Sequence, residues 1–415
     1  MSLREKIRDF VIDIAYLPVR LGVMRLPRKG WTVLHLKREL KKNNQKTPVN
    51  KIAFLLAQSY DLEHVENILR YLPQGLFDIV VCYYRNPFVR ARRNPLWLQV
   101  DKIKSVISEF DPSCCVRTFD DVVESRERYS VLVTVHSNIT HTGRYRGMSG
   151  VQLIANRVMF GAFSFNSVFG IDLFWMKFFE KVFCINSMQE SFLKRVPIKA
   201  RVLDYGSPRF DGGVELSTKL DRKSLDSKRK TILLLPTHKK TKRDLCTLLA
   251  MMQRFTADYN VVVGYYVFSL EEKESMEDAL HCKAPGVSLI IGEESVKLMP
   301  FADFVFCDYS AGTIITVIKM DKNVVVIKDR KDPSWMNDEY AAMLEPVRNK
   351  IGSFSVNEYE KIALILKNDA VWEQQRFVRA ELRKQYFSVH EEPSGKLIAD
   401  ELLRDLKAAI DYRLD

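Results

Sequence analysis

Short apolar runs recur along the chain between residues 51 and 330, and polar turns or amphipathic stretches separate them. Uninterrupted apolar runs are typical of strands that are buried on both faces of a parallel sheet. Alternation of such strands with helices predicts an α/β protein. Strands are expected at 52–56, 79–83, 131–135, 182–185, 201–203, 232–235, 261–266, 287–291, 304–307 and 324–327, and helices at 61–71, 313–319, 359–366, 370–386 and 394–412.

Residues 217–230 interrupt this alternation, because they are polar and charged apart from two leucines. A chain of 415 residues also exceeds what one hydrophobic core usually supports. We therefore predict two Rossmann-like, doubly wound domains joined by a linker. The expected divisions are an N-terminal segment 1–50, a first domain 51–216, the linker 217–230, a second domain 231–385 and C-terminal helices 386–415.

The N-terminal segment is strongly basic. Residues 1–50 hold twelve Lys or Arg and four Asp or Glu, out of a net charge of +12 for the whole chain. Apolar residues recur there at helical spacing, namely Leu3, Ile7, Phe10, Val11, Ile14 and Leu17. A basic amphipathic helix is typical of attachment to an anionic membrane surface. The alternative is a helix that packs on its own domain and exposes a basic face. No nucleic-acid-binding motif is present, so we expect no nucleic acid partner.

Other features of the composition restrict where in the cell the protein is expected. No run of eighteen apolar residues occurs, so the sequence predicts no membrane-spanning helix. Seven cysteines without a CxxC pair fit a reducing cytoplasm and predict no metal site. A peripheral protein on the cytoplasmic face of the cell membrane is the expected location.

An aromatic stretch lies between residues 160 and 183. We expect most of its rings to fill the core, although Lys177 and Lys181 beside them leave open a surface that faces lipid or acceptor. The rings are Phe160, Phe163, Phe165, Phe169, Phe174, Trp175, Phe178, Phe179 and Phe183.

The turn after the strand at 304–307 is the first candidate for binding chemistry. It contains Asp308, Ser310, Gly312 and Thr313, and a helix follows. The first N–H groups of a helix attract anions, and a glycine allows close approach, so the turn suits a phosphate group. A capped turn without a ligand, with Ser310 or Thr313 as the N-cap, is the alternative.

Two further loops bring charge to strand ends. Arg209 and Asp211 follow the strand at 201–203, where Gly206 and Pro208 predict a turn at the domain junction. Arg209 has the geometry to bind a phosphate with two N–H groups, but an Arg–Asp structural pair is equally compatible with the sequence. Thr237, His238 and Lys239 follow the strand at 232–235 and offer a hydroxyl, an imidazole and an ammonium to a diphosphate. A solvated basic loop is the alternative.

Two histidines follow the strand at 131–135. His136 and His141 are candidates for a general base, because the pKa of histidine lies near neutral pH. A loop histidine is also often a surface residue or a cap.

Three motifs together resemble the CDP-glycerol glycerophosphotransferase family, the teichoic-acid primases and polymerases with GT-B architecture. The motifs are Gly-Ser-Pro-Arg-Phe-Asp at 206–211, Leu-Pro-Thr-His-Lys at 235–239 and the Asp-Tyr-Ser motif at 308–310. The resemblance covers about residues 50–400. It implies that two Rossmann-like domains face a cleft, that the first binds the acceptor, and that the second holds a CDP-linked donor. It also implies peripheral membrane association and no cofactor besides the donor.

The sequence departs from the family at its histidines. A His-Gly pair at the start of a helix in the first domain serves the family as catalytic base, but here Phe160 precedes Gly161. A second family histidine, after the strand matched by 261–263, is replaced by Gly264. Residues 311–316 also lack the acid that the family carries after Asp-Tyr-Ser. Either His136 or His141 has become the base, or the donor and reaction differ, or catalysis has been lost.

Three functions are therefore compatible with the sequence. The first is transfer of an alditol phosphate from a CDP-linked donor to a lipid-linked or polysaccharide acceptor in cell-surface polymer synthesis. The second is a GT-B glycosyltransferase that uses a nucleotide sugar for surface polysaccharide. The third is a non-catalytic relative that acts as a binding subunit of a membrane-associated assembly.

The basic segment generates the first testable prediction. Deleting residues 1–30 should move the protein from sedimented anionic vesicles into the supernatant, and high salt should do the same to the intact chain, because exposed charges are screened. Neutral vesicles are the control, since they should bind the intact chain weakly. Equal sedimentation of the truncated and intact chains would contradict membrane attachment through this segment.

Overall fold

The structure is a computed structural model. It describes residues 47–56, 61–82, 100–109, 111–135, 151–163, 179–195, 199–211, 225–236, 242–265, 270–291, 295–308, 311–328 and 338–411. The amphipathic helix expected near the N-terminus lies outside these residues.

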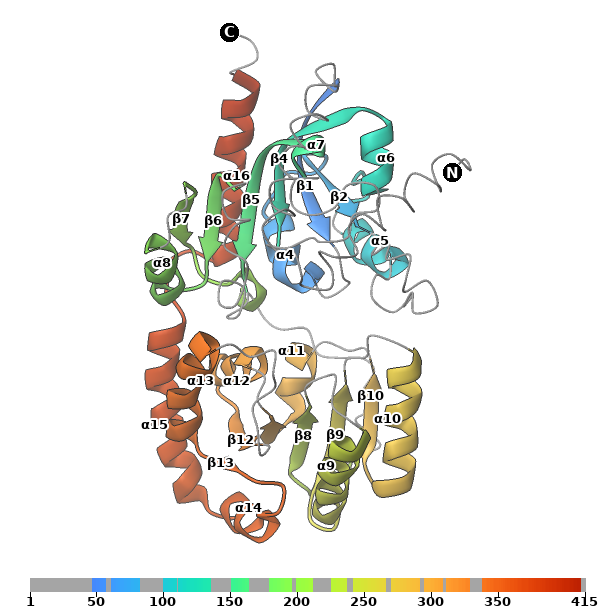
Figure 1. The fold of residues 1–415 in the computed structure, drawn as a ribbon, viewed down its shortest axis with the longest axis vertical. Coiled ribbons are helices and arrows are strands. Elements are labelled where there is room, and N and C mark those ends of the chain that lie inside the picture. The colour runs from blue at the N-terminus through green and yellow to red at the C-terminus, as the bar shows by residue number, and fades with distance from the viewer. Residues whose placement is uncertain are drawn as a thin grey trace, which may run out of the picture.

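Two parallel sheets form two domains, and the carboxyl ends of their strands face one another (Figure 1). The first sheet has seven strands in the order β3-β2-β1-β4-β5-β6-β7. Its strands are β1 (Thr47–Leu56), β2 (Phe77–Val81), β3 (Val116–Thr118), β4 (Glu127–Thr134), β5 (Ala155–Ala162), β6 (Lys181–Cys184) and β7 (Arg201–Asp204). This order is that of a doubly wound domain.

The second sheet has six strands in the order β10-β9-β8-β11-β12-β13. Its strands are β8 (Thr231–Leu235), β9 (Asn260–Tyr265), β10 (Ser288–Ile291), β11 (Phe304–Cys307), β12 (Asn323–Ile327) and β13 (Ser353–Phe354). The predicted fold class, two Rossmann-like domains in a GT-B-like arrangement, is thereby confirmed. The predicted linker at 217–230 falls between the sheets, and residues 225–230 of it are described.

Helices cover both faces of each sheet, as the uninterrupted apolar strands require. In the first half they are α4 (Asp61–Leu69), α5 (Val100–Ser108), α6 (Phe119–Glu124), α7 (Val151–Ile154), α8 (Ser187–Lys194) and the 3₁₀ turn η5 (Pro208–Phe210). In the second half of the sequence they are α9 (Lys242–Phe255), α10 (Leu270–Lys283), α11 (Ser295–Leu298), η7 (Met299–Phe301), α12 (Ala311–Lys319), α13 (Asp338–Ile351), α14 (Tyr359–Leu366), α15 (Asp369–Tyr386) and α16 (Ser394–Asp411). Of these, α16 packs on the first sheet.

The stretch that the resemblance matched to the start of a helix is instead strand β5. Met159 and Phe160 are fully buried between β4 and β6, so their side chains belong to the core. The four described rings of the aromatic stretch, Phe160, Phe163, Phe179 and Phe183, are all buried, which confirms the core interpretation for them. The other five lie outside the described residues.

The chain passes between the domains twice, and α16 returns to the first domain (Figure 1). It packs against α4, β1 and β4, and Ile398, Ala399 and Leu402 bury completely in the core of the first domain. The last helix of the chain is therefore a structural part of the first domain. Residues 51–216 without α16 would expose the apolar face that this helix covers.

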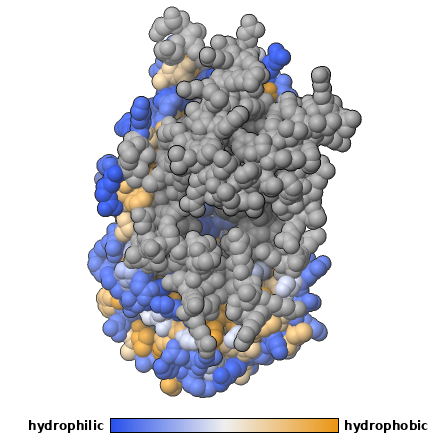
Figure 2. All heavy atoms as spheres, viewed as in Figure 1, coloured by the Kyte–Doolittle hydropathy of each residue, from blue (hydrophilic) through white to orange (hydrophobic). Residues whose placement is uncertain are grey.

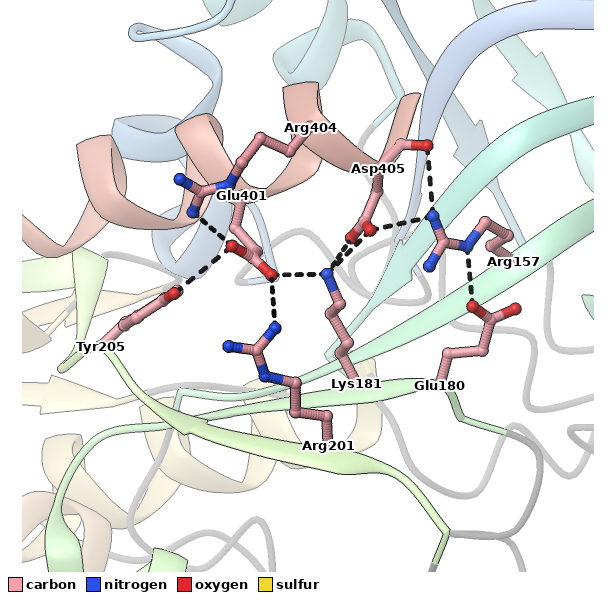
Figure 3. A network of polar contacts seen from close by, with 8 residues as sticks. All are labelled: Arg157, Glu180, Lys181, Arg201, Tyr205, Glu401, Arg404 and Asp405. Atoms are coloured by element: carbon pink, nitrogen blue, oxygen red, sulfur yellow. Dashed lines mark hydrogen bonds and ion pairs between the residues drawn. The ribbon is translucent and has the colours of Figure 1, made fainter. Parts of the chain in front are cut away.

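A buried ionic network fastens α16 to the first sheet (Figure 3). Lys181 on β6 donates to Glu401 and to both oxygens of Asp405, the latter at 2.7 Å. Arg157 on β5 contacts Asp405 at 2.9 Å and Glu180 at 2.7 Å. The side chains of Lys181, Glu401 and Asp405 are only 11%, 5% and 6% exposed, so each charge depends on its partners.

The network also shifts an ionisation equilibrium. Burial opposes ionisation of Glu401, but hydrogen bonds from Lys181 and Arg404 outweigh burial and hold the pKa of this carboxyl below its ordinary value. A carboxyl with a lower pKa in the folded state stabilises the fold at pH values above its unfolded pKa, and this contribution is lost as the pH falls through the folded pKa.

The described surface of the second domain contains both hydrophilic and hydrophobic residues. On the face shown in Figure 2, its described hydrophilic and hydrophobic residues alternate in small patches. Large apolar side chains that are exposed, such as Leu364 and Phe377, are scattered singly among the described residues. No helix in the described part of the chain is long and apolar enough to cross a membrane.

Lys181 provides a test of this architecture. Lys181→Met should lower the free energy of unfolding at pH 7 by about 3 kcal/mol, near the lower end for breaking a buried pair, because Arg157 and Arg404 still neutralise the two carboxylates in part. Chemical denaturation monitored by circular dichroism measures this loss. The loss should shrink as the pH falls through the lowered pKa of Glu401, because this carboxylate then takes up a proton in the folded state.

Lys194→Met is the matched control. The Lys194 side chain is 61% exposed and, within the described ranges, pairs with Glu190 along the surface of α8, so its removal should cost less than about 1 kcal/mol. Equal losses for the two variants would show that the network does not anchor α16.

Candidate functional site

The strand order reverses at one point in each sheet, between β1 and β4 and between β8 and β11. Ligands of doubly wound sheets bind beyond the carboxyl ends of the strands at such a point. Cys307 of β11 lies opposite Leu235 of β8, so the loops that follow these two strands begin side by side. The loop after β11 starts at Asp308, and the loop after β8 leads to Thr237, His238 and Lys239. Two of the sequence-predicted loops therefore leave the second sheet at its reversal point.

The turn between β11 and α12 combines a buried acid with a helix start. Asp308 is 1% exposed, and α12 begins at Ala311. Gly312 and Thr313 lie in the first turn of this helix, whose following residues Ile314 and Ile315 are buried. The backbone N–H groups of this first turn have no acceptor within the helix. Cys307 at the end of β11 is fully buried, and burial raises the pKa of its thiol well above its ordinary value.

Arg209 lies on the other side of the domain junction, in η5 at the end of the first domain. Asn67 of α4 donates to the carbonyl oxygens of Pro208 at 2.8 Å and Asp211 at 3.0 Å, so η5 is fixed on α4. The Arg209 guanidinium forms an ion pair with Glu63 in the first turn of α4. Its Nε is buried and has no hydrogen-bond partner among the described residues. This N–H group is thus buried and unpaired within the described residues.

Asp211 has a structural role that the sequence did not predict. Its carboxylate accepts hydrogen bonds from the backbone N–H groups of Ser394, at 3.0 Å, and Gly395, and so caps α16. Burial raises the pKa of Asp211 above its ordinary value, although these bonds and the charge of Lys319 oppose the rise. Gly206 is needed nearby because its φ of +80° is unfavourable for other residues. A contact between Asp211 and a donor stays a prediction.

Six of the predicted site residues lie outside the described part of the chain. They are His136, His141, Thr237, His238, Lys239 and Ser310. The backbone of Gly312 and Thr313 is described in α12, but their side chains are not. The two histidines come directly after β4, which pairs with β1 at the reversal point of the first sheet. This position keeps both as candidates for the base.

Both positions at which the family carries a histidine lie inside the core of this protein. Phe160 is fully buried and stacks on Phe179 with their ring centroids 5.1 Å apart. At Gly264 in β9, an added Cβ would lie 2.7 Å from Leu298 Cδ1 and 3.0 Å from Leu235 Cδ2. A side chain at 264 would therefore require these leucine methyl groups to shift. Phe160 and Gly264 thus serve the packing of the core in this protein.

Sequence reasoning missed Glu63, the partner of Arg209. An acid in the first turn of the helix that follows β1 was visible in the sequence, but it also fits ordinary helix-dipole stabilisation. Among the described residues, no group of three or more His, Cys, Asp or Glu side chains is placed to hold a metal ion.

Known structures share this fold. The wall teichoic acid polymerase TagF, in a structure soaked with CDPG, is 14% identical with a TM-score of 0.55 and covers 99% of this chain and 100% of its own. The UDP-GlcNAc 2-epimerase from Neisseria meningitidis, bound to UDP-GlcNAc, is 12% identical with a TM-score of 0.55 and covers 85% and 100%. Anabaena Alr3699/HepE, in complex with UDP and glucose, is 11% identical with a TM-score of 0.51 and covers 86% and 99%. Neither a protein-family model nor a curated protein sequence matches the chain. At these identities the likeness establishes the two-domain GT-B fold.

The packing at Gly264 can be tested directly. Gly264→Ala should lower the free energy of unfolding by about 1–3 kcal/mol, because the added methyl group overpacks the core between Leu235 and Leu298. Gly286→Ala is a suitable control, since the three atoms nearest to its added Cβ belong to Gln253 and Thr256 and lie at 3.1 Å or more. A neutral Gly264→Ala would contradict tight packing at this position.

Proposed function

We propose that the protein is a transferase that uses a nucleotide-linked donor. Its specific reaction is transfer of an alditol phosphate from a CDP-linked donor to a lipid-linked or polysaccharide acceptor. The observation that carries this proposal is the turn between β11 and α12, which places a helix start beside the end of β8 at the reversal point of the second sheet. Backbone N–H groups in that position bind phosphate oxygens.

The residues divide the chemistry between the two domains. The amino end of α12, with Ser310 and Thr313, and the loop with Thr237 and Lys239 would bind the phosphates of the donor. Arg209, at the end of the first domain, would bind from the other side. Fixed donors of this kind stabilise the negative charge that develops on the phosphates during transfer. His136 or His141, after β4, would take the proton of the acceptor hydroxyl.

The bonds that change follow from this arrangement. The acceptor oxygen forms a bond to the distal phosphorus of the donor, and the bond from that phosphorus to the bridging oxygen breaks. Cytidine monophosphate leaves with the electron pair of that bond. In the alternative reaction with a nucleotide sugar, the bond to the sugar carbon breaks and a nucleoside diphosphate leaves. The same phosphate-binding turn would serve both reactions.

The compared structures support a nucleotide-linked donor, but they differ in the nucleotide that each contains. TagF was soaked with CDPG, and the epimerase and HepE structures contain UDP-GlcNAc or UDP. Together with the three sequence motifs, TagF favours the CDP-linked donor, while the other two keep the nucleotide-sugar glycosyltransferase as a second candidate. The burial of Phe160 and the packing at Gly264 favour the third, a non-catalytic binding subunit. Attachment to the cytoplasmic face of the membrane through residues 1–50 is part of the proposal.

Nucleotide binding tests the proposal. CDP-glycerol should raise the melting temperature of the protein more than UDP-GlcNAc does, because a ligand that binds the folded state stabilises it by mass action. Ser310→Ala combined with Thr313→Val should weaken binding by about 1–3 kcal/mol, the range for hydrogen bonds to a charged group. Ser288→Ala, at the exposed amino end of β10, should bind like the wild type.

Substitution of the two histidines distinguishes an enzyme from a non-catalytic binding subunit. A general base replaced by alanine should reduce turnover by about 10²- to 10⁴-fold while nucleotide affinity stays unchanged. If neither His136→Ala nor His141→Ala affects turnover, the base assignment is wrong. If no CDP- or UDP-linked compound binds the wild type, the transferase proposal is wrong.

A further inference from the structure

The described ends of the two connections between the domains lie together at one small junction. Asp211, at the end of η5, is the last described residue before the first connection, which leads to the second sheet. The second connection begins at Phe387, which ends α15, and reaches α16 at Ser394. The hydrogen bonds of Asp211 to Ser394 and Gly395 hold the two connections together. The start of the first connection is therefore fixed beside the end of the second.

The pivot can be located within α15. Up to Arg383 this helix is tied to the second domain, since Arg379 and Arg383 contact Asp321 and Arg383 donates to the carbonyl of Ile318 at 3.1 Å. From Tyr386 onward the chain is tied to the first domain. Asn186 donates to the Tyr386 carbonyl at 2.6 Å, and the Ser388 backbone N–H donates to the Ile185 carbonyl at 3.2 Å. The change of attachment falls within one helical turn.

One charged side chain of the second domain enters this junction. Lys319 is the last residue of α12, and its Nζ lies 4.8 Å from the ring centroid of Phe387 and 5.9 Å from that of Phe210. The two rings meet edge to face, 5.7 Å apart. An ammonium over aromatic rings is attracted to their faces. Burial lowers the pKa of Lys319 below its ordinary value, while the charge of Asp211 opposes the decrease and that of Arg383 adds to it.

The same helix connects this contact with the candidate phosphate site. α12 presents its amino end to the switch point of the second sheet and Lys319, at its carboxyl end, to η5, which contains Arg209. A helix of nine residues is a rigid spacer of about 13 Å. A buried apolar cluster that includes residues of both sheets, Tyr386 and Phe387 surrounds the junction.

We propose that Lys319 is a positioning residue that sets the angle between the two domains. Its ammonium, held against Phe387 and Phe210, fixes η5 relative to α12 and so fixes Arg209 relative to the amino end of that helix. The consequence for ligand binding rests on the proposed function. The consequence for the domain angle does not, because it follows from contacts within the protein alone.

Small-angle X-ray scattering of the intact protein without ligand tests the domain angle. Lys319→Met keeps an unbranched apolar side chain but removes the charge, and it should shift the scattering profile and the radius of gyration from the wild-type values. Lys319→Arg should restore both, because a guanidinium also stacks on aromatic rings. A Lys319→Met profile identical to that of the wild type would overturn the proposal.

Lys322→Met is the matched control for lost stability. Burial lowers the pKa of Lys322 as well, but its ammonium donates to the carbonyls of Pro300, at 3.2 Å, and Ala302, at 3.1 Å, which both lie within the second domain. It should lose stability and keep the wild-type scattering profile. Equal changes in profile for the Lys319→Met and Lys322→Met variants would show a general loosening of the domain and would also overturn the proposal.

Nucleotide binding separates this inference from the proposed function. If CDP binds through both α12 and Arg209, Lys319→Met should weaken its affinity by about three- to tenfold, the factor that a cation–π contact supplies. In an Arg209→Lys background the same substitution should have a smaller effect, because the residue being positioned has changed. A wild type that binds neither CDP nor UDP would contradict the proposed function, while the scattering profiles would still decide the role of Lys319.

Discussion

The buried ammonium of Lys181 is the constraint on which the arrangement of the chain depends. A lysine inside a domain keeps its charge only if anions are buried with it, and here they come from α16, at the far end of the sequence. The first domain is therefore complete only when the chain has built the second domain and returned. Two connections between the domains follow from this, and their meeting point is where Asp211, Phe387 and Lys319 lie.

The elements whose bounds were predicted correctly are those with a clear apolar or helical pattern in the local sequence. The strand at 304–307 and the helix at 359–366 have the predicted bounds, because apolar runs and helical spacing leave little choice. β3 and β13 were missed because their residues are only partly buried and show no apolar run. β5 was misassigned because Asn156 and Arg157 interrupt its amino end and because the resemblance suggested a helix. The packing of α16 on the first sheet depends on long-range charge pairs that no local pattern encodes.

In the candidate site too, local sequence predicted the positions of loops but not the long-range contacts. Sequence placed the loops after β4, β8 and β11 correctly at strand ends, and the topology then brought the second and third of these together. It could not identify what Arg209 and Asp211 contact, because Glu63 and Ser394 are far from them in the sequence. The structure did show what occupies the two positions that the resemblance matched to histidines. A side chain at 264 would displace two leucine methyl groups, and Phe160 fills a place in the core.

The return of α16 has a consequence for how the protein is made. Lys181 and Asp405 are 224 residues apart. Because a ribosome adds about 5–20 residues per second, Asp405 is synthesised about 10–45 s after Lys181. During that time the apolar face that Ile398, Ala399 and Leu402 will cover is open to water. The nascent first domain therefore passes through a stage in which it resembles a chaperone substrate. Synthesis of the last helix ends that stage.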